Sequence, residues 1–380
     1  MADAANRWQC LIAALWLGIA GSAMFNLSPI FLASLSDAFQ LTNRQIGLLA
    51  GIEIGGFAVA SFSAPYWIFK LGYRKAAFTG VSSLIVGNLL SLLASNPTEL
   101  VIARLLTGLC GDGPTYITAI LILGARLDPT RAFGMLTFSN MCFTGIALML
   151  LPLVLVQSSW IALPCFLAML GGAGLFAVRW LPVHLVAAAA GRVRTTTTPS
   201  WCGFAALAGI FFFCIDLGAI WAFAERIGQS IGLDLQSVGF YLGLSMPFQA
   251  LGSLLAAVIG TTYGRVIPLL AALLGQMLAL MLLWDGGSEW LFFTAIALWG
   301  CSWNFGFNYQ LGQLADLPDG KHWLVLAPGG QATGIALGPS FTGLLLIGND
   351  YHQIILLAGA CVLLGLGLAL AVSKLQRNLS

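Results

Sequence analysis

Long apolar runs separated by short polar connections form the main pattern of this 380-residue chain. Each run holds roughly 20–25 residues, enough for a helix to cross a bilayer core of about 30 Å. The pattern predicts about twelve membrane-spanning helices. We expect them at residues 8–31, 44–68, 75–94, 98–125, 133–156, 160–178, 201–227, 235–261, 265–283, 290–314, 326–347 and 351–374.

Composition agrees with a protein that is embedded in a lipid bilayer. The chain is 59% hydrophobic and 8% charged, with a mean hydropathy of +0.92, values far from those of a soluble domain. A net charge of +2 and the lack of a soluble-length segment argue against a nucleic-acid partner. The cysteines form no Cys-x-x-Cys pair and the histidines have no second ligand at metal spacing. We therefore expect no metal and no cofactor.

The chain reads as two related halves joined by one long connection. Residues 144–148 reappear as residues 333–337, and Gly108 and Gly300 lie 192 positions apart, as do Leu41 and Leu233. We predict an N-terminal six-helix half at 1–181, a cytoplasmic linker at 182–200 and a C-terminal six-helix half at 201–380. Repeated halves of this kind are typical of transporters with the binding site between the halves.

Basic residues predict the orientation, because Lys and Arg accumulate in cytoplasmic loops. Placing the N-terminus inside leaves Arg44 and Arg226 facing outward. The cytoplasmic set is then Arg7, Lys70, Arg74, Lys75, Arg126, Arg131, Arg179, Arg192, Arg194, Arg265, Lys321, Lys374 and Arg377. We expect a multi-pass protein of the cell (inner) membrane with both termini in the cytoplasm.

Charged residues inside the predicted spans are the candidates for function. Glu53, Arg104 and Asp112 fall in the first half, and an Arg or Asp at mid-bilayer costs about 2.5–3.5 kcal/mol. Arg104, Gly108 and Asp112 follow one another at helical spacing, so both charges face one strip with a glycine between them. Two interpretations remain open: Arg104 pairs with a carboxylate to hold helices together, or a carboxylate carries a proton. Protonating an aspartate at pH 7 costs about 4 kcal/mol, close to the insertion cost, and a sodium ion would use the same residues.

The second half offers one buried carboxylate and a polar, aromatic strip. Asp216 lies near the middle of its span with no basic residue placed to pair with it. It either binds solute or a proton, or is a hydrogen-bonded core carboxyl. Asn304 and Asn308 share a helix face with Gly300, beside Trp303. If this strip lines a site, the site suits a small organic solute with apolar parts and a hydrogen-bonding group.

Three short motifs then suggest a family. Residues 72–75 read Gly-x-Arg-Lys in the connection between the second and third helices, Arg104 and Gly108 form Arg-x-x-x-Gly in the fourth, and Gly338-Pro339 lies in a glycine-rich eleventh helix. In this order the motifs resemble those of the major facilitator superfamily, over nearly the whole chain. The resemblance implies an all-α fold of twelve transmembrane helices in two six-helix halves, working by alternating access.

The resemblance also implies roles for particular residues. It places a cytoplasmic gate at Lys70, Gly72, Arg74 and Lys75, although the usual aspartate and leading glycine of this motif fall on Phe69 and Pro65. It associates Arg104 with proton coupling, and the charge argument above adds Glu53 and Asp112 as the carboxylates for that coupling. Since helices one, four, seven and ten line the cavity of that family, it implies substrate binding at Asn26, Tyr116, Phe212, Asp216, Trp303, Asn304 and Asn308, with Ser22 facing the same space.

We therefore predict a secondary active transporter that moves a small organic solute across the bilayer, coupled to protons and working as a monomer. An uncoupled facilitator is the alternative within transport, and a lipid scramblase or flippase is the alternative from a different class. No Gly-x-x-x-x-Gly-Lys-Ser/Thr loop is present, so ATP does not drive the protein directly. Hydrolase and metalloprotease motifs are missing as well, and we do not expect an enzyme.

Overall fold

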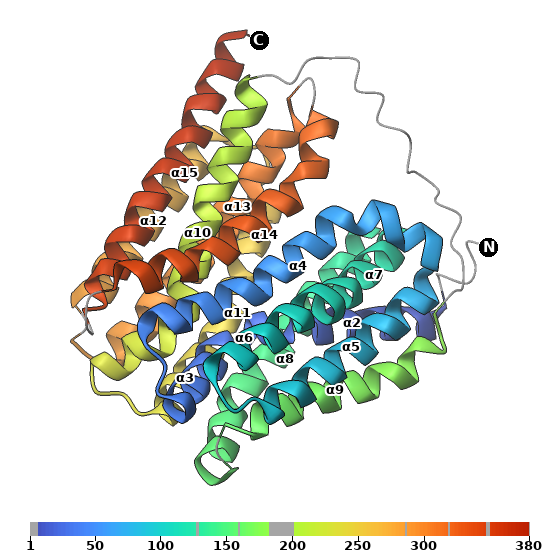
Figure 1. Ribbon diagram of the computed structural model, residues 1–380. Helices are drawn as coiled ribbons and strands as arrows, with labels where there is room; N and C mark the ends of the chain where they lie inside the picture. The colour runs from blue at the N-terminus through green and yellow to red at the C-terminus, as the bar shows by residue number, and fades with distance from the viewer. Residues whose placement is uncertain are drawn as a thin grey trace. The chain divides into compact units, whose positions relative to one another are not determined.

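The computed structural model describes residues 7–126, 129–158, 160–181, 201–285, 287–317, 320–346 and 350–379. Every regular element in these ranges is a helix. The chain divides into two compact units, unit 1 at Met1–Arg192 and unit 2 at Val193–Ser380 (Figure 1). The predicted linker at 182–200, with Arg192 and Arg194, lies outside the described residues, as do the side chains of Pro65, Phe69, Arg131, Lys321 and Arg377.

Unit 1 contains the six predicted segments, two of them interrupted. Its helices are α2 (Trp8–Asn26), α3 (Ser28–Phe39), α4 (Asn43–Leu71), α5 (Tyr73–Leu93), α6 (Pro97–Leu106), the π-helix η1 (Thr107–Asp112), α7 (Gly113–Gly124), α8 (Pro129–Ser158) and α9 (Ala162–Val178). The first segment was predicted to end at residue 31, but it breaks at Leu27 and continues to Phe39. Pro29 stands in the first turn of α3, and because proline has no N–H it cannot extend the hydrogen bonds of α2.

Unit 2 contains the other six segments without such breaks. Its helices are α10 (Trp201–Ser230), α11 (Leu235–Ile259), α12 (Val266–Asp285), α13 (Glu289–Ala315), α14 (Gly320–Leu345) and α15 (His352–Leu379). Helix α10 packs on α14 and α15, and α13 packs on α11 and α12. The start of α10 and the end of α15 lie at the same end of the unit (Figure 1), as an even number of crossings requires. The eleventh segment begins at Gly320 rather than at the predicted residue 326.

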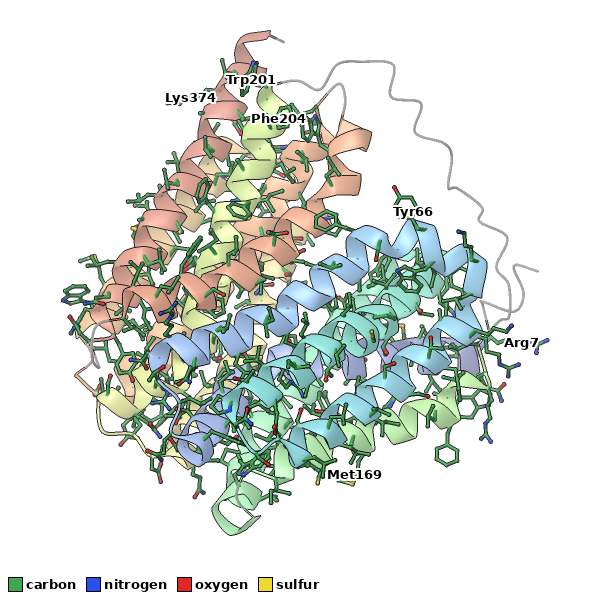
Figure 2. All side chains as sticks on the ribbon, in the orientation of Figure 1. Arg7, Tyr66, Met169, Trp201, Phe204 and Lys374 are labelled. Atoms are coloured by element: carbon green, nitrogen blue, oxygen red, sulfur yellow. The ribbon has the colours of Figure 1, made fainter. Side chains whose placement is uncertain are left out.

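The outer surface is apolar, as expected for a multi-pass membrane protein. Within the described residues, 9 helices are long and apolar enough to cross a membrane. Tyr66, Met169 and Trp201 project away from their helices (Figure 2). All three are exposed, as is Phe204, whose ring also packs against Trp323. Exposed apolar surface of this extent is stable against lipid rather than water.

Helix caps support the internal repeat. Thr42 caps α4 by accepting a hydrogen bond from the Gln45 N–H, and Asp234, 192 positions later, caps α11 in the same way. Asn96 caps α6, and Ser288, again 192 positions later, caps α13. Cap residues satisfy N–H groups that the first turn of a helix leaves free. The same offset at two independent helix starts is what a duplicated fold predicts.

Gly108 determines how closely η1 approaches α4. A Cβ atom built on Gly108 would overlap the carbonyl oxygen of Glu53. The two backbones therefore touch where a side chain would keep them apart, the small-residue packing that is common between membrane helices. This contact brings the residues on either side of Gly108 within reach of the Glu53 side chain.

We predict that Gly108→Ala destabilises the protein by about 1–3 kcal/mol, because the new methyl group meets backbone that must move. Thermal unfolding of the purified protein in detergent measures the effect as a lower Tm. Gly55→Ala in α4 is the matched control, since a Cβ there meets nothing within 4 Å. Equal Tm values for the two variants would contradict the close contact at Gly108.

Candidate functional site

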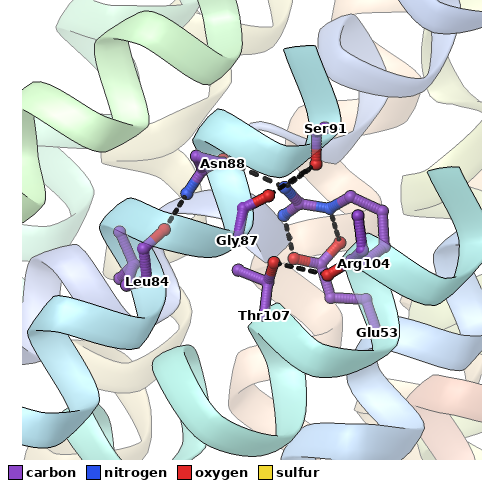
Figure 3. A network of polar contacts seen from close by, with 8 residues as sticks. Glu53, Leu84, Gly87, Asn88, Ser91, Arg104 and Thr107 are labelled. Atoms are coloured by element: carbon purple, nitrogen blue, oxygen red, sulfur yellow. Dashed lines mark hydrogen bonds and ion pairs between the residues drawn. The ribbon is translucent and has the colours of Figure 1, made fainter. Parts of the chain in front are cut away.

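A buried ion pair joins α4 to α6 inside unit 1 (Figure 3). Arg104 is 0% exposed and Glu53 is 2% exposed. The Arg104 Nε donates to Glu53 Oε2 at 2.8 Å, and Nη2 donates to Oε1 of the same carboxylate. This two-point geometry is the strong form of the arginine–carboxylate pair.

Polar groups of α5 complete the coordination of the guanidinium. Its Nη1 donates to Asn88 Oδ1 at 2.9 Å and to Ser91 Oγ at 3.4 Å. The Asn88 amide is itself fixed, because its Nδ2 donates to the Leu84 carbonyl at 2.8 Å. The guanidinium also lies over the Phe31 ring of α3, 4.9 Å from the centroid, a cation–π distance. One side chain therefore ties together α3, α4, α5 and α6.

Asp112 reaches the same pair through an irregular turn. The Gly113 N–H bonds the Gly108 carbonyl, five residues back, which defines the π-helix η1. Pro114 follows at once and cannot donate to the carbonyl four residues before it. Since a π-turn holds more residues than an α-turn, it rotates Asp112 toward the face of Arg104. The buried Asp112 carboxyl thereby lies beside the Glu53 carboxyl and near the Arg104 guanidinium.

The three groups together have a simple charge requirement. A hydrogen bond between two carboxyl groups needs a proton on one of them. With Glu53 ionised against Arg104 and Asp112 protonated, the group of three carries no net charge. Loss of that proton would leave two carboxylates facing one guanidinium in a buried site, which is unfavourable in a low dielectric. The arrangement can therefore hold one proton and respond to its loss.

Unit 2 lacks these charges at the corresponding places. The positions 192 residues after Glu53, Asn88 and Arg104 are Ser245, Leu280 and Ile296, and all three are buried. The position 192 residues after Asp112 is Asn304, whose amide donates to the Gly300 carbonyl of its own helix. The corresponding positions of unit 2 are therefore packed without an ion pair.

Asp216 is the buried carboxylate of α10, and it is 0% exposed. The Trp299 indole N–H, from α13, lies 3.2 Å from both of its oxygens. Trp221 stacks on Trp299 with a centroid distance of 6.5 Å. The ion pairs found among the described residues do not include Asp216. Its partner is thus a neutral donor, in contrast to the guanidinium beside Asp112.

The aromatic residues predicted on α10 and α13 pack mainly within unit 2. Trp303 stacks on Phe213 and Phe307, and its indole N–H donates to the Phe213 carbonyl at 3.0 Å. Phe212 lies against Phe211, with 5.4 Å between the ring centroids. The polar end of Trp303 is therefore occupied, whereas Phe212 remains partly exposed.

The amides predicted on α13 have different surroundings. Asn304 is partly exposed, and Asn308 is exposed. Asn308 donates to Ser253 Oγ at 3.2 Å and to the Asn304 carbonyl at 2.7 Å. The hydrogen bonds found for both amides among the described residues use the side-chain nitrogen.

Asn26 belongs to a polar cluster between α2 and α8. Its Nδ2 lies 3.3 Å from both Ser22 Oγ and Asn140 Oδ1. Ser22 and Asn140 also bond one another, with Asn140 Nδ2 donating to Ser22 Oγ at 3.0 Å. All three side chains are partly exposed. Tyr116 lies on α7 with its ring 5.7 Å from that of Phe57.

The predicted gate residues surround the tight turn between α4 and α5. Gly72 has φ +76°, a conformation that favours glycine. Arg74 donates from Nε to the Val178 carbonyl at 3.3 Å and from Nη2 to the Arg179 carbonyl, at the end of α9. Lys70 and Lys75 are exposed. Arg74 therefore connects the start of α5 to the end of α9.

Sequence reasoning missed Asn88, Ser91 and Asn140, the polar partners on α5 and α8. Each is a polar residue inside an apolar run, and that signal could have identified them. The π-helix had only the weaker signal of Gly111, Gly113 and Pro114 close together. Across the described residues, no group of three or more His, Cys, Asp or Glu side chains could hold a metal ion.

Part of the chain is similar in sequence to a known transporter. The chain is 30% identical over 100 residues to the galactose-proton symporter of Escherichia coli K12, a match that covers 26% of this chain and 21% of that relative. It thus spans about a fifth of the length of the curated relative.

Solved structures match over nearly all of the chain. A variant of the nucleoside transporter NupG has a TM-score of 0.75 at 15% identity, covering 95% of this chain and 99% of that one. A D-xylose-proton symporter has a TM-score of 0.73 at 12% identity, covering 94% and 97%. A bacterial homologue of the lysosomal transporter Spinster has 0.72 at 13%, covering 96% of each. At these identities the likeness shows the fold.

The family model "Major Facilitator Superfamily" matches residues 13–203, half of the sequence. The match covers unit 1, with its buried ion pair, and the structural likeness covers both units. Together with the predicted order of helices and motifs, these findings show that the chain belongs to the major facilitator superfamily of secondary transporters.

Proposed function

We propose that this protein is a proton-coupled secondary transporter for a small organic solute, and that Asp112 carries the proton. The observation that supports this proposal is the burial of the Asp112 carboxyl beside the carboxyl of Glu53, which is already paired with Arg104. One proton then decides whether the buried group is neutral or carries an unbalanced negative charge. A change of charge in a low-dielectric site favours a change of geometry. Proton binding and the arrangement of α4 and η1 are thereby linked.

Relatives support the choice of ion and the kind of solute. The curated relative is named as a galactose-proton symporter, and one structural neighbour as a D-xylose-proton symporter. Another neighbour is a nucleoside transporter. We propose a solute with hydroxyl or amide groups, in contact with Asn26, Tyr116, Phe212, Asp216, Trp303, Asn304 and Asn308, and we add Asn140 because it bonds both Ser22 and Asn26. Sodium in place of the proton is an outcome that the transport assay below would reveal.

We further propose that the protein works as a monomer in the cell (inner) membrane with both termini in the cytoplasm. The positive-inside distribution supports the orientation. Arg74 at the start of α5 contacts the end of α9, so the basic residues of both segments gather at one end of unit 1. Lys70, Gly72, Arg74 and Lys75 are proposed to act in gating at that end.

An uncoupled facilitator is the second candidate, and the completeness of the ion pair favours it. Arg104 has partners for every part of its guanidinium, as expected of a group that only holds helices together. The two candidates differ in what the charges do during transport. The variants below separate them.

Asp112→Asn is expected to abolish accumulation driven by a pH gradient while leaving solute counterflow, because an amide cannot release the proton. Uptake of candidate sugars and nucleosides into proteoliposomes, with a pH gradient, a sodium gradient or neither, is the measurement. Asp234→Asn is the matched control, since asparagine still caps α11. Unchanged accumulation in Asp112→Asn would remove Asp112 from coupling, and accumulation driven by sodium alone would replace the proton.

Arg104→Met is expected to destabilise the protein by about 3–5 kcal/mol, because Glu53 stays buried without its partner. The double variant Glu53→Leu/Arg104→Met should recover much of that loss, since both charges are gone. Thermal unfolding measures stability, and proteoliposome uptake measures function. A double variant that is stable and accumulates solute at the wild-type level would show that the pair is structural.

Asp216→Asn is expected to change solute affinity or the pH dependence of transport, because it removes a buried carboxylate whose described partner is a neutral indole. Trp299→Phe provides the comparison, as it deletes the indole donor and keeps the carboxylate. The apparent KM and rate are measured across pH 5–9 for each variant. If both variants lower Tm but leave KM and the pH profile unchanged, Asp216 is a packing residue.

A further inference from the structure

A basic cavity lies between α5 and α9 at one end of unit 1, away from the buried ion pair. Its volume is about 560 Å³, and Arg74, Lys75 and Arg179 are among its lining residues. Leu71, Phe78 and Leu175 supply most of its apolar wall. The lining residues, all within the described part of the chain, include no carboxylate. Three cations thus share one hollow without an acidic partner in its wall.

Exposed apolar side chains lie in and beside the cavity. Phe78 is 56% exposed and lines the cavity, and Phe176, on the neighbouring turn of α9, is 70% exposed. Trp180 follows Arg179 in the sequence, and the Arg179 guanidinium lies over the Trp180 ring, 4.8 Å from its centroid. Tryptophan and arginine together at the end of an apolar helix are typical of the lipid headgroup level. A lipid headgroup at this level would meet the cations of the cavity, and its acyl chains would meet the exposed apolar side chains.

Arg74 gives the cavity a fixed shape. Its Nε and Nη2 donate to the carbonyls of Val178 and Arg179, which fixes the guanidinium of a residue that lines the cavity. Lys75 and Arg179 are exposed, so an anion can reach their charged ends. A fixed guanidinium with two exposed cations beside it is suited to a phosphodiester.

We propose that this cavity binds the headgroup of an anionic phospholipid, with the first carbons of an acyl chain against Phe78 and Leu71. A free phosphate ion would offer the same charge, but it would leave the apolar wall and the exposed phenyl rings without a partner. Bound lipid would join α5 to α9 beside Arg74 and stabilise the connection that this arginine makes. The binding is independent of whether Asp112 carries a proton.

The test compares the Tm of the purified protein with phosphatidylglycerol, phosphatidylcholine or glycerol phosphate added. Phosphatidylglycerol is expected to raise the wild-type Tm by about 3–5 °C, since a ligand that binds only folded protein stabilises it, whereas the other two should not. Native mass spectrometry should show phosphatidylglycerol retained on the protein. Lys75→Gln/Arg179→Gln is expected to lose at least half of both signals; Arg74 is left in place because it holds the end of α9.

The matched control is Arg44→Gln/Lys374→Gln, which removes the same charge from two exposed positions elsewhere in the chain. It should keep the wild-type response to phosphatidylglycerol. Equal loss in both double variants would mean general attraction to an anionic surface, and an undiminished response in Lys75→Gln/Arg179→Gln would exclude the cavity. A Tm rise with glycerol phosphate equal to that with lipid would assign the site to a soluble anion. Transport is not measured, so these results stand apart from the proposed proton coupling.

Discussion

The burial of the Arg104 guanidinium is the constraint on which the structure of unit 1 depends. A charged arginine in a bilayer is stable only when its donors are satisfied inside the protein. Here the Glu53 carboxylate, the Asn88 amide and the Phe31 ring meet it from three different helices. Each of these helices must therefore keep its position relative to α6. Removing one partner leaves a buried charge without compensation, which is why such pairs are more sensitive to single than to double substitutions.

Two backbone features allow the pair to form. Gly108 lets η1 touch the backbone of α4 at Glu53 itself. The side chains of Arg104 and Asp112, on either side of the glycine, are therefore close to the Glu53 carboxylate. The π-turn then adds a residue between Arg104 and Asp112 and directs Asp112 to the same place. Irregular turns of this kind have weaker hydrogen-bond geometry and are often found at functional sites. Asp112 therefore lies in the η1 turn, where the backbone hydrogen bonds have weaker geometry than in a regular α-helix.

Sequence patterns predicted most of the helices and only part of the candidate site. Apolar runs of membrane length are strong signals, so segments such as α4 and α12 begin and end within a few residues of the prediction. The family was predicted from three motifs in order, residues 72–75, Arg104 with Gly108, and Gly338-Pro339. The break at Leu27 and the π-helix η1 were not predicted, because both arise from the effect of a proline on the backbone hydrogen bonds before it. Nor could one sequence show that Asn88 and Ser91 meet Arg104, since that contact joins different helices.

The two halves differ most in how they treat a buried carboxyl group. Asp112 lies beside the Glu53–Arg104 pair, whose cation belongs to the same unit. A change in the charge of Asp112 can therefore be compensated by a rearrangement within α4, α6 and η1. Asp216 has a neutral indole as its described partner. Compensating the charge of its carboxylate therefore requires an additional positive or hydrogen-bonding group. A bound solute can supply such a group. This difference is the physical reason to propose the coupling ion in unit 1 and a main solute contact in unit 2, on one duplicated fold.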